Sequence, residues 1–125
     1  MLPFIERIYV KGSLTNIDLD GDGKPDSFQF QLTNPFPYGG SISSMSLKID
    51  DEAVPPDSIE AELEGKVWKG GEVSDKNPVY IKPFATVYVR VKGRTLTPGE
   101  HKLSITIRIL ELGQSYTIEV KDTVK

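Results

Sequence analysis

The segment LSITIRILELGQSYTIEV (residues 103–120) decides the fold of this chain. Aliphatic side chains occupy every second position from Leu103 to Ile109, and the same alternation returns from Tyr116 to Val120. A period of two residues is typical of a β-strand with one buried face and one face in water. Turn-forming residues separate the two halves, so the segment predicts two strands, which we expect to pair antiparallel.

Other parts of the chain repeat this pattern. Three further stretches alternate in the same way, at residues 28–32, 45–49 and 87–91. A hairpin is predicted over residues 59–68, and turn signals or strand breaks stand at 35–40, 50–51, 55–56 and 97–100. No window carries a helical apolar stripe. The sequence therefore predicts an all-β protein of about eight short strands. We expect an antiparallel two-sheet β-sandwich of jelly-roll or immunoglobulin-like type, with little or no helix.

Length and charge narrow the classes of protein. The 125 residues fit a single domain spanning residues 1–125. The net charge is −3 and the basic residues are scattered, so we expect no nucleic-acid partner. No apolar run is long enough to span a membrane. The absence of cysteine and of an apolar signal region in residues 1–7 predicts a cytoplasmic protein.

The run DLDGDGKPD (residues 18–26) is the best candidate for a metal site. Its opening matches the start of a calcium-binding loop, in which carboxylate and carbonyl oxygens surround the ion. In that register Asp18, Asp20 and Asp22 supply side-chain oxygens. Lys24 supplies its backbone carbonyl, and Asp26 binds directly or through water. We therefore predict a structural Ca²⁺ and no catalytic cofactor.

This acidic loop departs from an EF-hand in two respects. The twelfth position is Gln29, where an EF-hand has a bidentate glutamate, and the flanks predict strands. Residues 18–26 resemble the Asp-rich loops of dockerins and thrombospondin type 3 repeats. We expect the loop to join a strand near residues 9–14 to the strand at 28–32. The alternative is a solvated Asp/Gly turn without a metal.

Candidates for catalysis are few. His101 is the only histidine and follows Gly99 at the start of a strand, so we expect an exposed turn residue. Glu60, Glu62 and Glu64 share one face of a predicted strand, where solvation accounts for them. A second histidine for a His-based metal cluster is missing. The sequence therefore predicts that this chain is not an enzyme by itself.

Aromatic residues offer candidate contacts. Pro35, Phe36, Pro37 and Tyr38 form a stiff loop, which we predict to bind a partner because its ordering cost is small. Trp68 lies in a short polar hairpin. It is either a ligand-binding residue, for example for a sugar, or a cap on the end of the core.

Five strand-and-turn blocks carry a resemblance to a known family. They lie at residues 10–16, at 28–32 together with 37–40, at 47–59, at 85–89 and at 96–101. In their order and spacing they resemble the small β subunit of C-glycoside deglycosidases and its uncharacterised relatives. This resemblance implies a subunit that pairs with a larger, metal-dependent TIM-barrel catalytic subunit acting on sugars or glycosides. The partner would carry the metal and the acid/base residues.

Two hypotheses about function follow from the sequence. The first is a non-catalytic accessory subunit that supports the assembly of a catalytic chain. The alternative is a free-standing β-sandwich module that binds carbohydrate or protein and holds a structural Ca²⁺. Either protein can form a homo-oligomer, and the sequence leaves that option open.

Overall fold

The two strands predicted at residues 103–120 form the longest hairpin of the protein. In the computed structural model, β9 (Gly99–Ile109) and β10 (Gln114–Val124) pair antiparallel, with Ile105 opposite Ile118. Both of these side chains are buried, and their neighbours along each strand are more exposed. The two-residue period therefore marks the buried face, as the sequence predicts.

The structure describes residues 5–125. Residues 1–4 lie outside the described residues. They are part of the predicted domain (residues 1–125) and of the N-terminal stretch without an apolar signal region (residues 1–7). Within residues 5–125 the helical elements are three short 3₁₀ turns: η1 (Ile5–Ile8), η2 (Pro56–Ser58) and η3 (Gly70–Glu72). None of them has the length and apolar character needed to cross a membrane.

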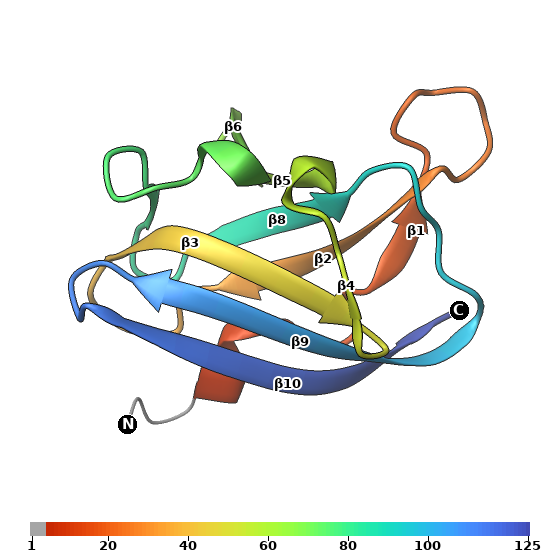
Figure 1. Cartoon of the computed structure of the whole chain (residues 1–125). Helices are drawn as coiled ribbons and strands as arrows, with labels where there is room; N and C mark the ends of the chain where they lie inside the picture. Colours follow the sequence, from red (N-terminus) through yellow and green to blue (C-terminus); the bar gives the residue numbers. More distant parts are fainter. Residues whose placement is uncertain (1–4) are drawn as a thin grey trace.

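The strands form two antiparallel sheets that lie face to face (Figure 1). Sheet A has the order β1 (Thr15–Ile17), β2 (Ser27–Thr33), β8 (Thr86–Val91), β5 (Ile59–Leu63) and β6 (Lys66–Lys69). Sheet B has the order β10, β9, β3 (Gly40–Ile49) and β4 (Glu52–Ala53), and β7 (Val79–Ile81) also pairs with β3. The prediction of an all-β, two-sheet antiparallel sandwich is confirmed.

The core lies between the sheets and takes its side chains from both. Its fully buried members come from β2, β3, β8, β9 and β10: Phe28, Phe30, Leu32, Ile49, Val87, Val89, Val91, Leu103, Ile105, Ile107 and Ile118. Facing apolar side chains from two sheets bury one another from water, which is the main favourable term in folding. The alternating positions of the sequence thus supply most of this core.

Two local predictions differ from the structure. The strand expected near residues 9–14 is replaced by a single bridge, Tyr9 to Leu32, followed by a turn, and the acidic loop joins β1 to β2. β7 was not predicted. Its three residues are too few to show a period, and they become a strand only by pairing with the start of β3.

A buried carboxylate fixes the N-terminal segment to β10. Asp122 Oδ2 accepts hydrogen bonds from the Tyr9 hydroxyl (2.6 Å), the Gly12 N–H (2.9 Å) and the Leu14 N–H (3.4 Å). Its other oxygen accepts the Thr123 N–H at 2.9 Å. Burial raises the pKa of the Asp122 carboxyl, but these donors outweigh burial and leave that pKa below its usual value.

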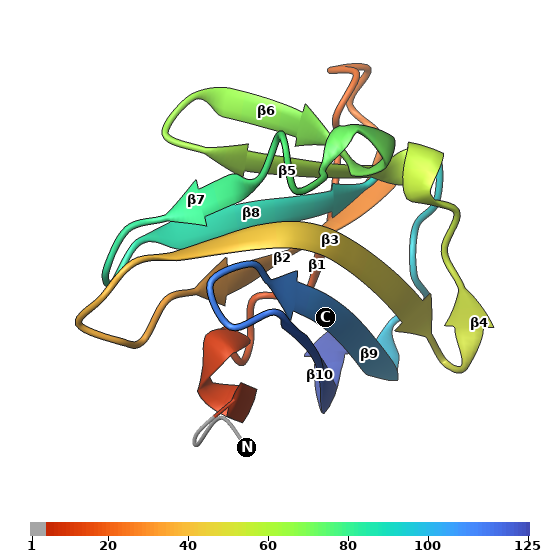
Figure 2. The same ribbon diagram turned by 60° about the vertical axis from the view of Figure 1, so that its left-hand side comes forward.

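The loops gather at two opposite ends of the sandwich. The acidic loop projects from one end (Figure 1, upper right). Residues 34–39, the β7–β8 turn and the β9–β10 turn lie together at the other end, as Figures 1 and 2 both show. We call this second end the loop end.

Candidate binding site at the loop end

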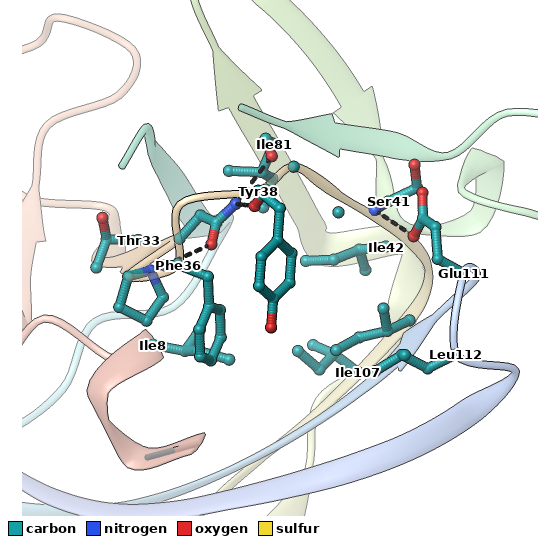
Figure 3. Close-up of a pocket in the computed structure, with 15 residues that line it drawn as sticks. Ile8, Thr33, Phe36, Tyr38, Ser41, Ile42, Ile81, Ile107, Glu111 and Leu112 are labelled. Atoms are coloured by element: carbon teal, nitrogen blue, oxygen red, sulfur yellow. Dashed lines mark hydrogen bonds between the residues drawn. The ribbon is translucent and has the colours of Figure 1, made fainter. Parts of the chain in front are cut away.

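A pocket opens between the two sheets at the loop end (Figure 3). Its volume is about 210 Å³, and apolar side chains dominate its lining. The lining comes from η1, the loop after β2, the start of β3, β7 and the β9–β10 hairpin: it includes Ile8, Phe36, Tyr38, Ile42, Ile81, Ile107, Ile109 and Leu112. Segments far apart in sequence therefore build one apolar site.

The loop predicted to bind a partner forms one wall of this pocket. Pro35, Phe36 and Tyr38 all line it, and the Phe36 and Tyr38 rings stack at 5.4 Å with 13° between their planes. Asn34 fixes the loop from inside: its Nδ2 donates to the Tyr38 carbonyl (2.8 Å), and its Oδ1 accepts the Phe36 N–H (3.0 Å). The Tyr38 ring extends toward the middle of the pocket (Figure 3).

Asn34 also holds the β7–β8 turn. Its Nδ2 lies 3.1 Å from the Ile81 carbonyl oxygen. Its backbone N–H donates to Ala85, and its carbonyl accepts the Phe84 N–H, both at 2.9 Å. One half-buried polar side chain and its peptide groups therefore tie the pocket wall to the neighbouring turn.

Large apolar side chains are exposed around the pocket. Of the seven large hydrophobic residues exposed among residues 5–125, four lie at the loop end: Tyr38, Tyr80, Phe84 and Leu112. Tyr80 stands beside Gly39, where an added Cβ would collide with the tyrosine ring. Such a concentration of exposed apolar surface is typical of an interaction site.

Two charged groups at this end have contacts within the chain. The Glu111 carboxylate accepts the Ser41 N–H at 2.8 Å, and Lys82 pairs with Glu64 at 3.1 Å. Burial raises the pKa of Glu111, but the hydrogen bonds from Ser41 outweigh burial and leave that pKa below its usual value. Glu111 is therefore a negative charge at the rim of the pocket, and the rest of the lining is suited to an apolar partner.

The acidic loop brings four predicted ligands together. Carboxylate oxygens of Asp18, Asp20, Asp22 and Asp26 lie within 4.8 Å of one another, so this cluster can hold a metal ion. The loop also satisfies these oxygens itself: Asp18 Oδ2 accepts the Gly23 N–H at 2.7 Å. The fifth predicted ligand, the Lys24 carbonyl, stays a prediction.

The crowding of these carboxylates changes their proton affinities. The Gly23 N–H, above all, lowers the pKa of Asp18, and the Ser27 hydroxyl lowers that of Asp26. Asp20 differs, because desolvation and its two carboxylate neighbours outweigh the Asp22 N–H and raise its pKa. Asp20 is therefore the carboxylate whose ionised form is most disfavoured by its neighbours. Binding of a proton or a cation would reduce this repulsion.

Trp68 is part of the core. Only 6% of its surface is exposed, and it lies opposite Ala61 in the β5–β6 hairpin. The Lys66 ammonium sits 4.6 Å from the ring centroid, a cation–π contact. Of the two interpretations of Trp68, the structure favours the residue that caps the core.

His101 is buried, which corrects the expectation of an exposed turn residue. Its Nδ1 lies 2.7 Å from Asp50 Oδ2 and its Nε2 lies 2.7 Å from the Thr97 carbonyl. Both ring nitrogens therefore face acceptors, and Asp50 and then Thr97 raise the pKa of the imidazole. No sequence pattern indicates this contact, because Asp50 is 51 residues away.

Two of the three glutamates considered for acid/base chemistry form surface ion pairs. Glu62 lies 2.6 Å from Arg90, and Glu64 pairs with Lys82. Both carboxylates are partly or largely exposed, so these pairs contribute little to stability. Their placement agrees with a solvated strand face and differs from that of a catalytic pair.

Fold and pocket define a small β-sandwich domain with an apolar pocket and exposed apolar side chains at one end. A family model described as hydroxymethylglutaryl-CoA reductase, N-terminal domain, matches residues 4–125. The chain belongs to this family. No curated protein matches it.

Among solved structures, the chain is similar to a family 123 glycoside hydrolase from Clostridium perfringens, described in a study of glycolipid glycan hydrolysis. The two are 14% identical with a TM-score of 0.38, over 79% of this chain and 21% of the hydrolase chain. The chain thus spans about a fifth of that structure. A similarity this weak supports no conclusion about this protein.

The family match corrects the resemblance seen in the sequence. The chain does not belong with the β subunits of C-glycoside deglycosidases, because the reductase N-terminal domain family accounts for residues 4–125. The blocks that suggested the resemblance are strands followed by turns, which recur in any antiparallel sandwich. The TIM-barrel partner stays a prediction that rested on that resemblance alone.

Proposed function

We propose that this chain is a non-catalytic accessory domain that binds the catalytic region of a hydroxymethylglutaryl-CoA reductase. The observation that carries the proposal is the loop end, where an apolar pocket and four exposed large apolar side chains lie together. The name of the family supplies the partner, either in the same polypeptide or in a separate one. In this arrangement the reductase carries the chemistry, and the domain contributes a docking surface.

The size of the pocket favours a protein side chain as its occupant. At about 210 Å³ it is smaller than the pockets of roughly 300–1,000 Å³ that take drug-sized ligands. It is larger than an apolar cavity of about 150 Å³ that holds benzene. One aromatic or branched aliphatic side chain of the partner therefore fits, whereas a molecule the size of coenzyme A does not.

The electrostatics of the loop end point to the same kind of partner. Lys82 is paired with Glu64, and the exposed Glu111 carboxylate accepts the Ser41 N–H. A nucleic acid or an anionic membrane would need unpaired basic groups at this surface. A protein with an apolar patch complements the pocket while the Glu111 carboxylate stays in water at its rim.

The test is a titration of the purified chain into the purified reductase catalytic polypeptide from the same organism, followed by calorimetry. We expect Tyr38→Ala to weaken binding at least about tenfold, because the ring projects into the pocket. Tyr88→Ala is the matched control, since Tyr88 lies on β8, on the outer face of sheet A. The proposal fails if the wild-type chain does not bind, or if the two variants bind equally.

The acidic loop supports a second function, that of a structural Ca²⁺ site. Four carboxylates within 4.8 Å, one of them with a raised pKa, leave a concentration of negative charge that a cation would neutralise. Ca²⁺ should then raise the melting temperature, because it binds only the folded state. Asp20→Ala should abolish the rise. No shift at about 1 mM Ca²⁺, the weak end of the range for such loops, would contradict the site.

A further inference from the structure

The β7–β8 turn holds an aromatic residue in a conformation that normally belongs to glycine. The Ala85 N–H donates to the Lys82 carbonyl at 3.1 Å, Pro83 occupies the second position of the turn, and Phe84 the third. Phe84 has a φ of +62°. This is the pattern of a type II turn, whose third position needs a positive φ and usually carries glycine or asparagine.

Phe84 differs from the other non-glycine residues with positive φ. Among residues 5–125 these are Asp50, Asp51, Glu64 and Phe84. The first three are polar and lie in hairpin turns, where aspartate in particular tolerates the left-handed conformation. A bulky aromatic residue in that region is a true outlier.

The side chain gains little from the fold in return. Phe84 is 67% exposed, the most exposed of the seven large hydrophobic residues exposed among residues 5–125. A glycine at this position would remove both the backbone strain and the exposed ring. Strained residues that the surrounding structure keeps in place cluster at binding and active sites, and the outlier is the starting point for a functional hypothesis.

Hydrogen bonds hold the backbone of Phe84 in position before any partner arrives. The Phe84 N–H donates to the Asn34 carbonyl at 2.9 Å, and Asn34 Nδ2 lies 3.3 Å from the Lys82 carbonyl oxygen. The same Asn34 side chain binds Phe36 and Tyr38 at the pocket wall. The turn that carries Phe84 and the pocket wall are thus tied together through one residue, which reduces the backbone entropy lost on binding.

We propose that Phe84 is the anchor residue of the docking surface. The inference rests on the proposed function and deepens it: the partner presents an apolar cavity that takes the Phe84 ring, and an apolar side chain that enters the pocket. Aromatic anchors in fully desolvated cavities carry much of the binding energy of interfaces. Lys82, two residues before Phe84, is already paired with Glu64, so docking of the ring does not bury an unpaired lysine.

Two substitutions at the same position test this inference. Phe84→Gly and Phe84→Ala both remove the ring, but only glycine accepts the positive φ without strain. Both should weaken binding to the purified reductase catalytic polypeptide at least about tenfold. In the isolated chain, glycine relieves the backbone strain but also raises the entropy of the unfolded chain. The net effect should be a melting temperature for Phe84→Gly about 2–4 °C above that of Phe84→Ala.

The outcomes separate the inference from the proposed function. If Tyr38→Ala weakens binding and Phe84→Gly does not, the anchor is wrong and the docking surface stands. If the wild-type chain does not bind, or neither variant changes binding, both fail. If Phe84→Gly melts below Phe84→Ala, the turn is not strained, and the inference is overturned whatever the binding shows.

Discussion

Removal of the Asp122 carboxylate should destabilise the protein more than loss of any surface charge. The Asp122→Ala change leaves the Tyr9 hydroxyl and the Leu14 N–H, both buried, without an acceptor. The 2.6 Å bond from Tyr9 is short and charge-assisted, the strong class of hydrogen bond. The buried donors left without an acceptor and the lost charge-assisted bond together should lower the free energy of unfolding by about 3–5 kcal/mol. For a chain of this size that lowers the melting temperature by roughly 10–20 °C.

Urea unfolding of Asp122→Ala, Tyr9→Phe and the double variant measures this lock. Tyr9→Phe removes one donor and keeps the carboxylate, so it should lower the free energy of unfolding by about 1.5–2 kcal/mol. This variant should stay folded even where Asp122→Ala fails to fold. The double variant lacks the Tyr9 hydroxyl, so it has one buried donor fewer without an acceptor than Asp122→Ala has. The double variant should therefore lose less free energy of unfolding than the two single variants lose in sum. A cost below about 1 kcal/mol for Asp122→Ala, or strict additivity, would refute the reasoning.

The same group has a pH signature with a definite sign. The folded-state pKa of Asp122 lies below its unfolded value of about 3.9. The stabilisation is therefore present above that unfolded value and is lost as the pH falls through the folded value. Asp122→Asn should flatten the acid limb of the stability curve. An acid limb unchanged in this variant would show that other carboxylates carry it.

Two further predictions concern other positions. The folded-state pKa of His101 is raised above its ordinary value of about 6.5, so its contribution is present below that value and is lost as the pH rises through the folded one. Urea unfolding from pH 5 to 9 should show this loss in the wild type and not in His101→Gln; equal pH profiles would contradict it. Gly70→Ala should cost about 1–3 kcal/mol in thermal unfolding, because the new Cβ would collide with a backbone carbonyl. Gly71→Ala, whose Cβ would have no neighbour closer than 3.6 Å, is the control, and equal losses would be contrary to the reasoning.

The sequence predicted the sheets well because the strands are long and half-buried. In β2, β8 and β9 the apolar positions alternate strictly, and burial follows the same alternation. β7 escaped prediction, since a strand of three residues has no period to detect and depends on pairing with β3. Pattern alone therefore finds strands long enough to show the two-residue period, and misses a short strand that forms only by pairing with a neighbour.

The binding site was only partly predictable, for a related reason. The stiffness of the loop at residues 35–40 singled out Phe36 and Tyr38, and both line the pocket. Ile107 and Leu112 complete it from the other side of the fold, and no sequence pattern links them to that loop. Phe84 did leave a signal, a proline followed by a bulky residue at a turn, but its exposure and φ come only from the structure.

Hydrogen exchange of the chain, alone and with the purified reductase catalytic polypeptide, tests the central claim most directly. The account predicts slower exchange of backbone amides at residues 34–41, 79–85 and 109–113, the segments that form the loop end. It predicts no change in the acidic loop at 18–26 or in the β5–β6 hairpin. Protection confined to those two regions, or no protection anywhere at saturating reductase, would contradict docking through the loop end.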